Sequence, residues 1–263
     1  MTAADMNPAF RWIERNSREY LECVPLAARA RHLFSTRQLE LPSDPALRRA
    51  NIDLFASDLG VDPARLVRAR QVHGNAVIVV DGNAVTVLDA RENLPREPAD
   101  ADAIVTTAPS TACAVQIADC VPILIAGSSA VAAVHAGWRG TAAGVAAQAV
   151  RALAALGSEP STLVAAIGPS IAPCCYQVDA RVRDAFAQSA HADAALEGFA
   201  PDGEGHWRLD VALINRRILE QCGVPASQIH ESRLCTACDL ERFYSYRAEG
   251  AGTGRLIAGI AVP

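Results

Sequence analysis

The sequence predicts a single α/β domain in which mixed β-sheets are flanked by helices. Short apolar runs of strand character alternate along the 263 residues with segments of helical periodicity, and no linker or repeat interrupts them. Several of the strand-like runs are apolar on both faces, which predicts burial on both sides of a sheet. The chain is 51% hydrophobic and 20% charged, so we expect a core of ordinary globular size.

The beginning of the chain is expected to differ from the rest. Residues 1–30 carry mixed charge and scattered aromatic side chains, so we predict a peripheral N-terminal segment with one helix from Asn7 onward. Residues 31–263 are predicted to form the domain itself. Its first strand is expected at residues 32–37, where it leads into a loop.

A helix follows this loop, and its two ends are marked in the sequence. Ser43 or Asp44 can cap the first turn, and Pro45 suits the first helical position. Apolar residues recur at helical spacing up to Leu59, and Gly60 is expected to end the element.

The remaining elements alternate between strands and helices. Turn residues between three short runs favour an antiparallel meander at residues 66–72, 76–80 and 85–88, followed by a proline-containing loop at 91–99. Further strands are expected at residues 103–106, 112–117, 121–125, 131–135, 163–167, 228–232 and 256–262. Helices are expected at residues 141–156, 179–189 and 209–222.

Charge and hydropathy exclude several classes of partner. The chain has 24 Lys and Arg against 29 Asp and Glu, a net charge of -5, without a basic cluster. We therefore expect neither nucleic acid nor an anionic membrane as a partner. No apolar segment is long enough for a membrane span, and the start lacks the pattern of a secretion signal, so we expect a cytoplasmic protein.

Eight cysteines favour metal binding or catalysis over a disulfide framework in a cytoplasmic chain of this length. Close spacings occur at Cys174-Cys175 and in Cys235-Thr236-Ala237-Cys238. The latter pair has no second Cys-x-x-Cys, and the nearest histidine precedes it. Ordinary packing of small residues is therefore favoured there over a zinc ribbon.

Three metal-competent side chains, His73, Cys120 and His135, each stand at an end of an apolar run. Two imidazoles and one thiolate can hold a zinc ion and leave its fourth position open. A lone buried His or Cys is more often a core residue. Here Gly74 and Gly137 permit turns beside the two histidines, and strand ends are common places for sites.

Five groups of motifs, in this order, resemble the laccase-domain (YfiH-like) family, formerly called multicopper polyphenol oxidase. They are RQVHG at 70–74, ADCVP at 118–122, HAGWRG at 135–140, AIGP with PCCY at 166–176, and FYSYR with TGR at 243–255. HAGWRG together with ADCVP is highly specific. The resemblance implies a YfiH-like zinc enzyme domain over residues 31–263, with one zinc on His73, Cys120 and His135. It departs from the family at residues 38–42 and at Asn51-Ile52, so no substrate contact is implied there.

The older family name does not fit the ligand count. Four coppers require many imidazoles, whereas the chain has 6 histidines and 2 methionines, both of the latter within the first six residues. Copper outcompetes zinc for such ligands, so a single copper, and with it a polyphenol oxidase, stays an alternative.

The resemblance implies activity on purine nucleosides: phosphorolysis of adenosine, inosine, guanosine and methylthioadenosine, and deamination of adenosine. For deamination, Asp119 is the predicted general acid/base beside a zinc-activated water. For phosphorolysis, Arg139, Arg37 and Arg247 are predicted anion clamps. For Arg37 and Arg247, the sequence is equally consistent with a surface ion pair and no contact to phosphate.

Further residues are predicted to contact the substrate, and two alternative functions are considered. Gln71 and Tyr176 are predicted to contact substrate, although packing is the default for an aromatic ring. Cys120 is both a predicted ligand and, paired with a histidine, a nucleophile in an alternative reading as a hydrolase that edits peptidoglycan precursors. Three ligands instead of four disfavour a purely structural zinc module. A homodimer, in which a partner subunit completes the pocket, stays open.

Overall fold

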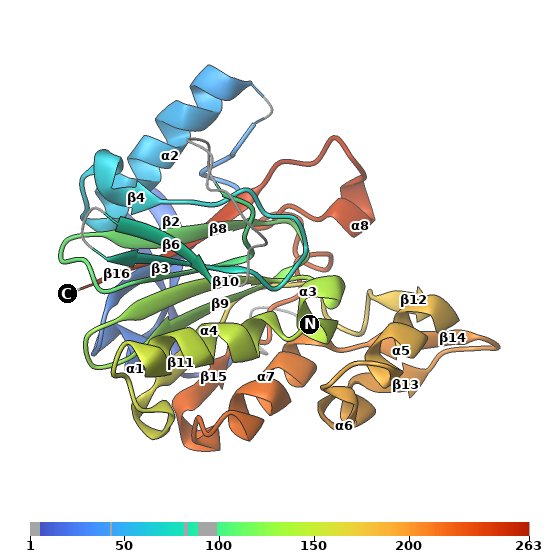
Figure 1. Ribbon diagram of the computed structural model, residues 1–263. Helices are drawn as coiled ribbons and strands as arrows, with labels where there is room; N and C mark the ends of the chain where they lie inside the picture. Colours follow the sequence, from blue (N-terminus) through green and yellow to red (C-terminus); the bar gives the residue numbers. More distant parts are fainter. Residues whose placement is uncertain (1–5, 43, 82–83, 89–98, 263) are drawn as a thin grey trace.

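A computed structural model describes residues 6–42, 44–81, 84–88 and 99–262. Two β-sheets pack face to face at its centre, and helices cover both outer faces (Figure 1). One apolar core lies between the sheets, a second lies under helix α2, and a third lies under helices α4 and α7. The predicted α/β class, with mixed sheets flanked by helices, is confirmed.

Within the described residues, the strands form three sheets. In spatial order, the first contains β1 (Phe10–Arg15), β2 (Arg18–Cys23), β3 (Arg31–Ser35), β16 (Leu256–Ala261), β8 (Ala112–Ile117) and β4 (Leu66–Val67). The second contains β15 (Ile229–Glu231), β11 (Val164–Ile167), β9 (Val121–Ala126), β10 (Val131–Ala136), β7 (Ala103–Thr106), β5 (Val77–Asp81) and β6 (Ala84–Leu88). A small third sheet contains β12 (Gln177–Asp179), β14 (His206–Leu209) and β13 (Phe199–Pro201).

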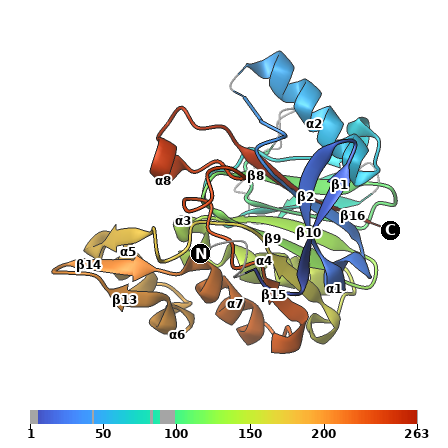
Figure 2. The ribbon, with the colours of Figure 1, turned by 180° about the vertical axis from the view of Figure 1, so that it is seen from behind.

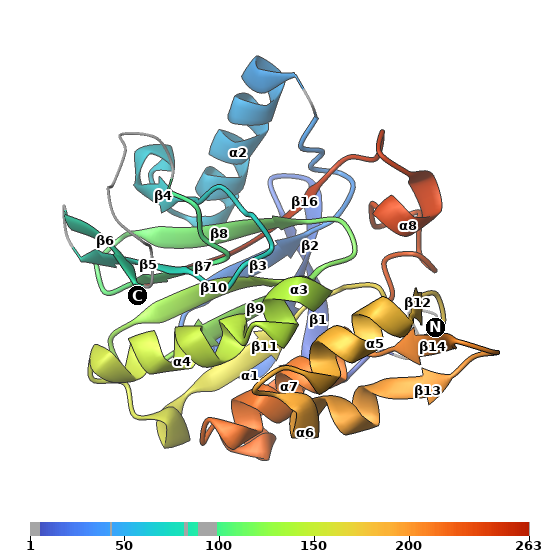
Figure 3. The same cartoon turned by 45° about the vertical axis from the view of Figure 1, so that its right-hand side comes forward.

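The helices are α1 (Val24–Ala27), α2 (Pro45–Leu59), α3 (Trp138–Ala142), α4 (Val145–Ala155), α5 (Ala180–Ala187), α6 (Ala192–Ala195), α7 (Val211–Gln221) and α8 (Tyr246–Glu249). Figure 3 shows α4 and α7 along one face of the central layers, and α5 and α6 beside the small sheet. Across the described ranges, no helix has both the length and the apolar character needed to cross a membrane.

Strands β9 and β10 are buried on both faces, as their apolar sequences predict. Because side chains alternate along a strand, Ile123 and Ile125 point toward the helices, whereas Leu124 points into the core between the sheets. The antiparallel register pairs Pro122 with His135. This register brings the residues just before β9 close to the end of β10.

Two helix predictions have different outcomes. Helix α2 begins where predicted: Asp44 caps it by accepting a hydrogen bond from the backbone N–H of Leu47, and Gly60 ends it in the left-handed region with φ 79°. The single helix expected over residues 141–156 is wrong, because the chain forms α3 and α4 with a break at Gly144, where φ is 81°. The ring of His191 occupies the space that a side chain at position 144 would need.

The helix predicted from Asn7 onward is wrong, because residues 10–23 form the β1–β2 hairpin of the first sheet (Figure 2). Tyr20 and Leu21 of this hairpin are fully buried. Mixed charge along β1 misled the prediction, since β1 is the edge strand and its outward residues are polar.

The predicted meander is correct only in part. Strands β5 and β6 pair antiparallel, but β4 joins the other sheet, parallel to β8. The loop predicted at 91–99 lies mostly outside the described residues. The small third sheet was not predicted, because its strands are only three or four residues long.

A buried carboxylate ties α2 to the N-terminal hairpin. Asp58 accepts hydrogen bonds from Asn16 Nδ2 at 2.6 Å, Arg18 Nε at 2.7 Å and Tyr20 Oη at 2.5 Å. Burial raises the pKa of the Asp58 carboxyl, but the three donors outweigh it, and the pKa lies below its ordinary value. The network therefore stabilises the fold at pH values above the ordinary pKa range of a carboxyl group. This contribution is lost as the pH falls through the lowered pKa of Asp58.

We expect Asp58→Asn to lower the free energy of unfolding by about 3 kcal/mol at neutral pH, because a buried ion pair loses one partner. Urea unfolding at neutral pH and at about pH 3 measures the effect, which should shrink at the acidic pH. Asp53→Asn on the same helix is the control, since its pair with Arg49 is exposed and contributes about 0.5 kcal/mol or less. An equal decrease in the free energy of unfolding in the two variants would contradict the stabilising role assigned to Asp58.

Candidate metal centre and active site

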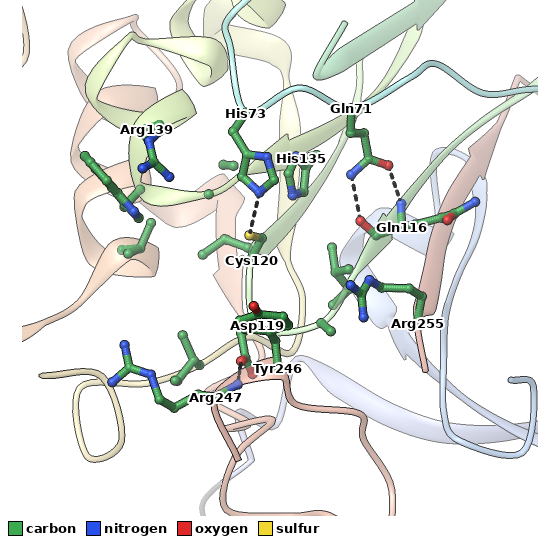
Figure 4. A pocket seen from close by; sticks show the side chains of 18 of the residues that line it. Gln71, His73, Gln116, Asp119, Cys120, His135, Arg139, Tyr246, Arg247 and Arg255 are labelled. Carbon is green, nitrogen blue, oxygen red and sulfur yellow. Dashed lines mark hydrogen bonds between the residues drawn. The ribbon is translucent and has the colours of Figure 1, made fainter. Parts of the chain in front are cut away.

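The structure brings the three predicted metal ligands together. Cys120 directly precedes β9, His135 is near the end of β10, and His73 lies on the loop between β4 and β5. Their ligand atoms lie within 4.8 Å of one another, with 3.9 Å between His73 Nε2 and Cys120 Sγ. The two imidazole rings meet edge to face, with 4.9 Å between their centroids (Figure 4). Binding of a metal by these residues stays a prediction.

Asp102, which the sequence reasoning missed, organises this cluster. It directly precedes β7, and its side chain is fully buried. Its Oδ1 lies 2.7 Å from His135 Nδ1 and accepts a hydrogen bond from the backbone N–H of His73 at 3.0 Å. Its Oδ2 accepts the backbone N–H of Gly74 at 2.6 Å. An acidic residue at the start of a buried apolar run was the available signal.

The Asp102 carboxylate also fixes the tautomer of His135. Burial raises the pKa of Asp102, but the hydrogen bonds from His135 and Gly74 lower it below its ordinary value, so the group is ionised. An ionised carboxylate can only accept, so His135 Nδ1 donates its proton to Asp102, and Nε2 is the nitrogen that is left for a metal. Carboxylates commonly orient metal-binding histidines in this way.

The thiol of Cys120 is prepared for metal binding. Burial raises its pKa, but contacts with His135 and His73 outweigh burial and lower the pKa to about 6. For His135, burial lowers the pKa, whereas Asp102 and Cys120 raise it to about 9. The metal-free pair is therefore a thiolate beside an imidazolium at neutral pH. A soft cation replaces the imidazolium proton readily.

The backbone leaves little free space around the cluster. A Cβ atom at Gly137 would lie 3.0 Å from Cys120 Sγ and 3.0 Å from His73 Cδ2. His73 and Asp119 both adopt positive φ angles, 61° and 83°, which are costly for residues other than glycine. Two imidazoles and one thiolate in closely packed surroundings are a ligand set that suits zinc or copper.

The cluster lines a pocket of about 770 Å³. Cavities of this size hold drug-sized ligands. Among the described residues that line it, six are arginines and only Asp119 is a carboxylate. The arginines are Arg48, Arg68, Arg70, Arg139, Arg247 and Arg255. This imbalance predicts a positive potential and an anionic ligand.

Arg48, Arg68 and Arg255 form a group of like charges in this lining, and the sequence reasoning did not find it. Burial and then Arg255 lower the pKa of Arg48, and burial and then Arg48 lower the pKa of Arg68. Arg48 donates to the Gln116 side-chain oxygen, and Arg255 donates to the carbonyls of residues 253 and 254. Within the described ranges, none of the three forms an ion pair with a carboxylate.

The structure places three predicted contacts in the pocket lining. The Arg139 guanidinium stacks on the Trp138 ring, 4.4 Å from its centroid, and Arg247 lies 4.9 Å from the Tyr176 ring centroid. Burial is the main cause that raises the pKa of Tyr176, to about 12, so its hydroxyl stays protonated. The roles predicted for Arg139, Tyr176 and Arg247 stay predictions.

The other predicted site residues are held by the protein itself. Gln71 lines the pocket, but its side-chain amide exchanges two 2.7 Å hydrogen bonds with the Gln116 backbone. Asp119 accepts from Thr236 Oγ1 and from the backbone N–H of Arg247, both at 2.7 Å. Arg37 lies outside the pocket lining and pairs with Glu249. The structure therefore does not bring Arg37 to the metal cluster.

Fold and site together define a class of two-sheet α/β proteins with a His-His-Cys cluster in a cationic pocket. Residues 37–263 match the family described as multi-copper polyphenol oxidoreductase laccase. The chain belongs to this family, and the resemblance deduced from the motifs is confirmed.

Two curated proteins and one solved structure show what this chain is similar to. The chain is 41% identical over 215 residues to purine nucleoside phosphorylase SCO2081 of Streptomyces coelicolor, covering 81% of each chain. It is 37% identical over 222 residues to adenosine deaminase RL5 of an unknown prokaryotic organism, covering 82% of this chain and 83% of the relative. The fold matches the crystal structure of the Bacillus licheniformis hypothetical protein YfiH with a TM-score of 0.82 and 28% identity, over 98% of this chain and 100% of the other.

We expect Asp102→Asn to weaken metal binding at the cluster by about 10- to 100-fold, because His135 loses the partner that orients it. Competition with a chromogenic chelator measures the affinity. Asp100→Asn is the matched control, since that carboxylate pairs with Arg70 at the surface. Unchanged affinity in Asp102→Asn would contradict the role assigned to this carboxylate.

Proposed function

We propose that this chain is a zinc-dependent purine nucleoside phosphorylase that also deaminates adenosine. The observation that carries the proposal is that one pocket combines a three-ligand metal cluster with six arginines. The names of the relatives, at 37% and 41% identity, support a purine nucleoside as substrate. Adenosine, inosine, guanosine and methylthioadenosine are the proposed substrates.

His73, Cys120 and His135 would hold the zinc, which supplies a Lewis acid with an open coordination position. Three ligands are typical of catalytic zinc, whereas closed structural sites use four. The thiolate form of Cys120 and the His135 ring that Asp102 orients favour this assignment.

Phosphorolysis needs a phosphate held beside C1′ of the ribose. A phosphate oxygen forms a bond to C1′ while the bond from C1′ to the purine nitrogen breaks, and the proton that the phosphate carried passes to the departing purine. Arg48, Arg68 and Arg255 are the proposed phosphate ligands, because guanidinium groups bind phosphate with several charge-assisted hydrogen bonds. Bound phosphate also relieves the mutual repulsion of these arginines.

Deamination uses water in place of phosphate. The water oxygen becomes bonded to C6 of adenine, the C6 amino group leaves as ammonia, and one proton moves from the water to that group. Asp119 is the carboxylate of the pocket lining and is the proposed carrier of this proton. Arg139, Arg247 and Tyr176 are the proposed contacts to the nucleoside. Arg139 and Arg247 lie on the side of the cluster away from Arg255 (Figure 4), and the Tyr176 ring lies beside Arg247.

We expect the purified protein to convert adenosine and phosphate into adenine and ribose 1-phosphate, and adenosine alone into inosine. Chromatography of a panel with and without phosphate measures both. The panel also contains a phenolic oxidase substrate and a nucleotide-linked muramyl amino acid. Turnover of one of these two compounds, with no nucleoside product from metal-loaded protein, would contradict the proposal.

We expect Arg48→Gln to raise the KM for phosphate by about 10-fold or more, because a charge-assisted hydrogen bond contributes about 1.5–3 kcal/mol. The KM for the nucleoside should change much less. Arg49→Gln is the control: it removes the same charge from the next residue of α2, where the side chain pairs with Asp53. An equal rise of the phosphate KM in both variants would indicate a general charge effect and would contradict a phosphate site at Arg48.

A further inference from the structure

Four cysteines meet at a second place in the structure, apart from the His-His-Cys cluster. Cys174 and Cys175 lie on the loop between β11 and β12, and Cys235 and Cys238 lie on the loop between β15 and α8. All four sulfur atoms lie within 4.8 Å of one another. Cys238 Sγ is 3.5 Å from Cys174 Sγ and 3.4 Å from Cys175 Sγ.

These separations match four thiolates around one metal ion better than they match disulfides. A Zn–S distance of about 2.3 Å gives tetrahedral edges of roughly 3.8 Å between sulfur atoms. A disulfide requires about 2.05 Å. Cys238 is nearly equidistant from Cys174 and Cys175, so a bond to either one would leave two thiols of the cluster unpaired.

The local backbone turns both cysteines of the second loop toward the centre. The backbone N–H groups of Cys238 and Asp239 both donate to the Cys235 carbonyl at 3.2 Å, which makes a tight turn within the Cys-x-x-Cys segment. Cys235 is buried, and its sulfur accepts the backbone N–H of Ala172 at 3.4 Å. A hydrogen bond of this kind stabilises a sulfur that carries negative charge.

Ordinary core packing does not account for the cluster. Cys174 and Cys238 are exposed, whereas small core residues are buried. A dication at the centre would displace the thiol protons and bring the four sulfur atoms together as ligands.

We propose that Cys174, Cys175, Cys235 and Cys238 bind a second zinc ion as a closed tetrathiolate. Four protein ligands leave no open position, so this zinc is structural. The site goes beyond the proposed nucleoside activity and raises the expected content from one zinc per chain to two.

The position of the cluster gives this zinc a structural task. The first loop carries Ile171 and Tyr176 into the pocket lining, and the second leads to Tyr246 and Arg247. The two loops also pair directly, since the Ser170 N–H donates to the Leu234 carbonyl at 3.2 Å and the Thr236 N–H donates to the Ser170 carbonyl at 3.0 Å. Asp119 adds contacts to both loops, because its carboxylate accepts from Thr236 and Arg247 and its carbonyl accepts the N–H of Ile171 at 2.9 Å. The tetrathiolate crosslinks the same two loops. It thereby fixes the position of the pocket-lining residues that these loops carry.

Metal analysis of the whole protein, purified under reducing conditions, tests the proposal. We expect two zinc ions per chain in the wild type, one in Cys120→Ala and one in Cys238→Ala. Cys222→Ala is the control, because Cys222 lies at the end of α7 outside the cluster, and it should keep two. Cys238→His should also keep two, since histidine is a zinc ligand, and this variant separates loss of a ligand from misfolding.

Thiol labelling gives a second readout that does not involve nucleoside turnover. We expect the exposed Cys174 and Cys238 to resist a thiol reagent until a chelator removes the zinc. One zinc per chain in the wild type, lost in Cys120→Ala and unchanged in Cys238→Ala, would overturn the proposal. A disulfide within the cluster in fully reduced, zinc-supplemented protein, found by mass spectrometry, would overturn it as well. Either result leaves the test of nucleoside activity unaffected.

Discussion

The candidate site depends on the buried carboxylate of Asp102. The side chain of His135 projects from a strand, whereas His73 lies on a loop with a backbone conformation that is unfavourable by itself. Asp102 bonds the His135 imidazole and the backbone N–H groups at His73 and Gly74, so one anion holds both histidine segments. Because these donors keep the carboxylate ionised inside the protein, they also set the tautomer of His135. We therefore expect replacement of this group to disturb the His135 side chain and the backbone at His73 together.

The rest of the pocket follows from the two-sheet architecture. The first sheet and α2 contribute Gln116, Arg48 and Arg255, whereas the second sheet and its connections contribute the metal cluster, Arg139 and Tyr176. Arginines from both sides therefore face one cavity, and Asp119 is the one carboxylate among the described residues that line it. An anionic ligand compensates this charge, and a cofactor-sized neutral ligand does not. This electrostatic constraint favours phosphate as a co-substrate of the proposed nucleoside enzyme.

The sequence indicated the residues of the His-His-Cys cluster because they lie in short motifs at strand ends, where local pattern and position coincide. His73, Cys120 and His135 were found in this way, as were α2 with its caps and the doubly buried β9 and β10. The arginine group and Asp102 could not be found in the same way. Their roles arise from contacts between residues distant in the chain. The same reason explains β4, whose partner strand lies about 45 residues away, and the four cysteines, whose two pairs meet only in the folded chain.

The measurement that tests the central claim most directly is a crystal structure of the protein with phosphate and adenine, with anomalous diffraction recorded at the zinc edge. The account predicts a zinc peak between His73, Cys120 and His135, and phosphate oxygens within hydrogen-bond distance of Arg48, Arg68 and Arg255. The absence of an anomalous peak at the His-His-Cys cluster in zinc-supplemented crystals would contradict the account. Phosphate bound away from these arginines would contradict it as well.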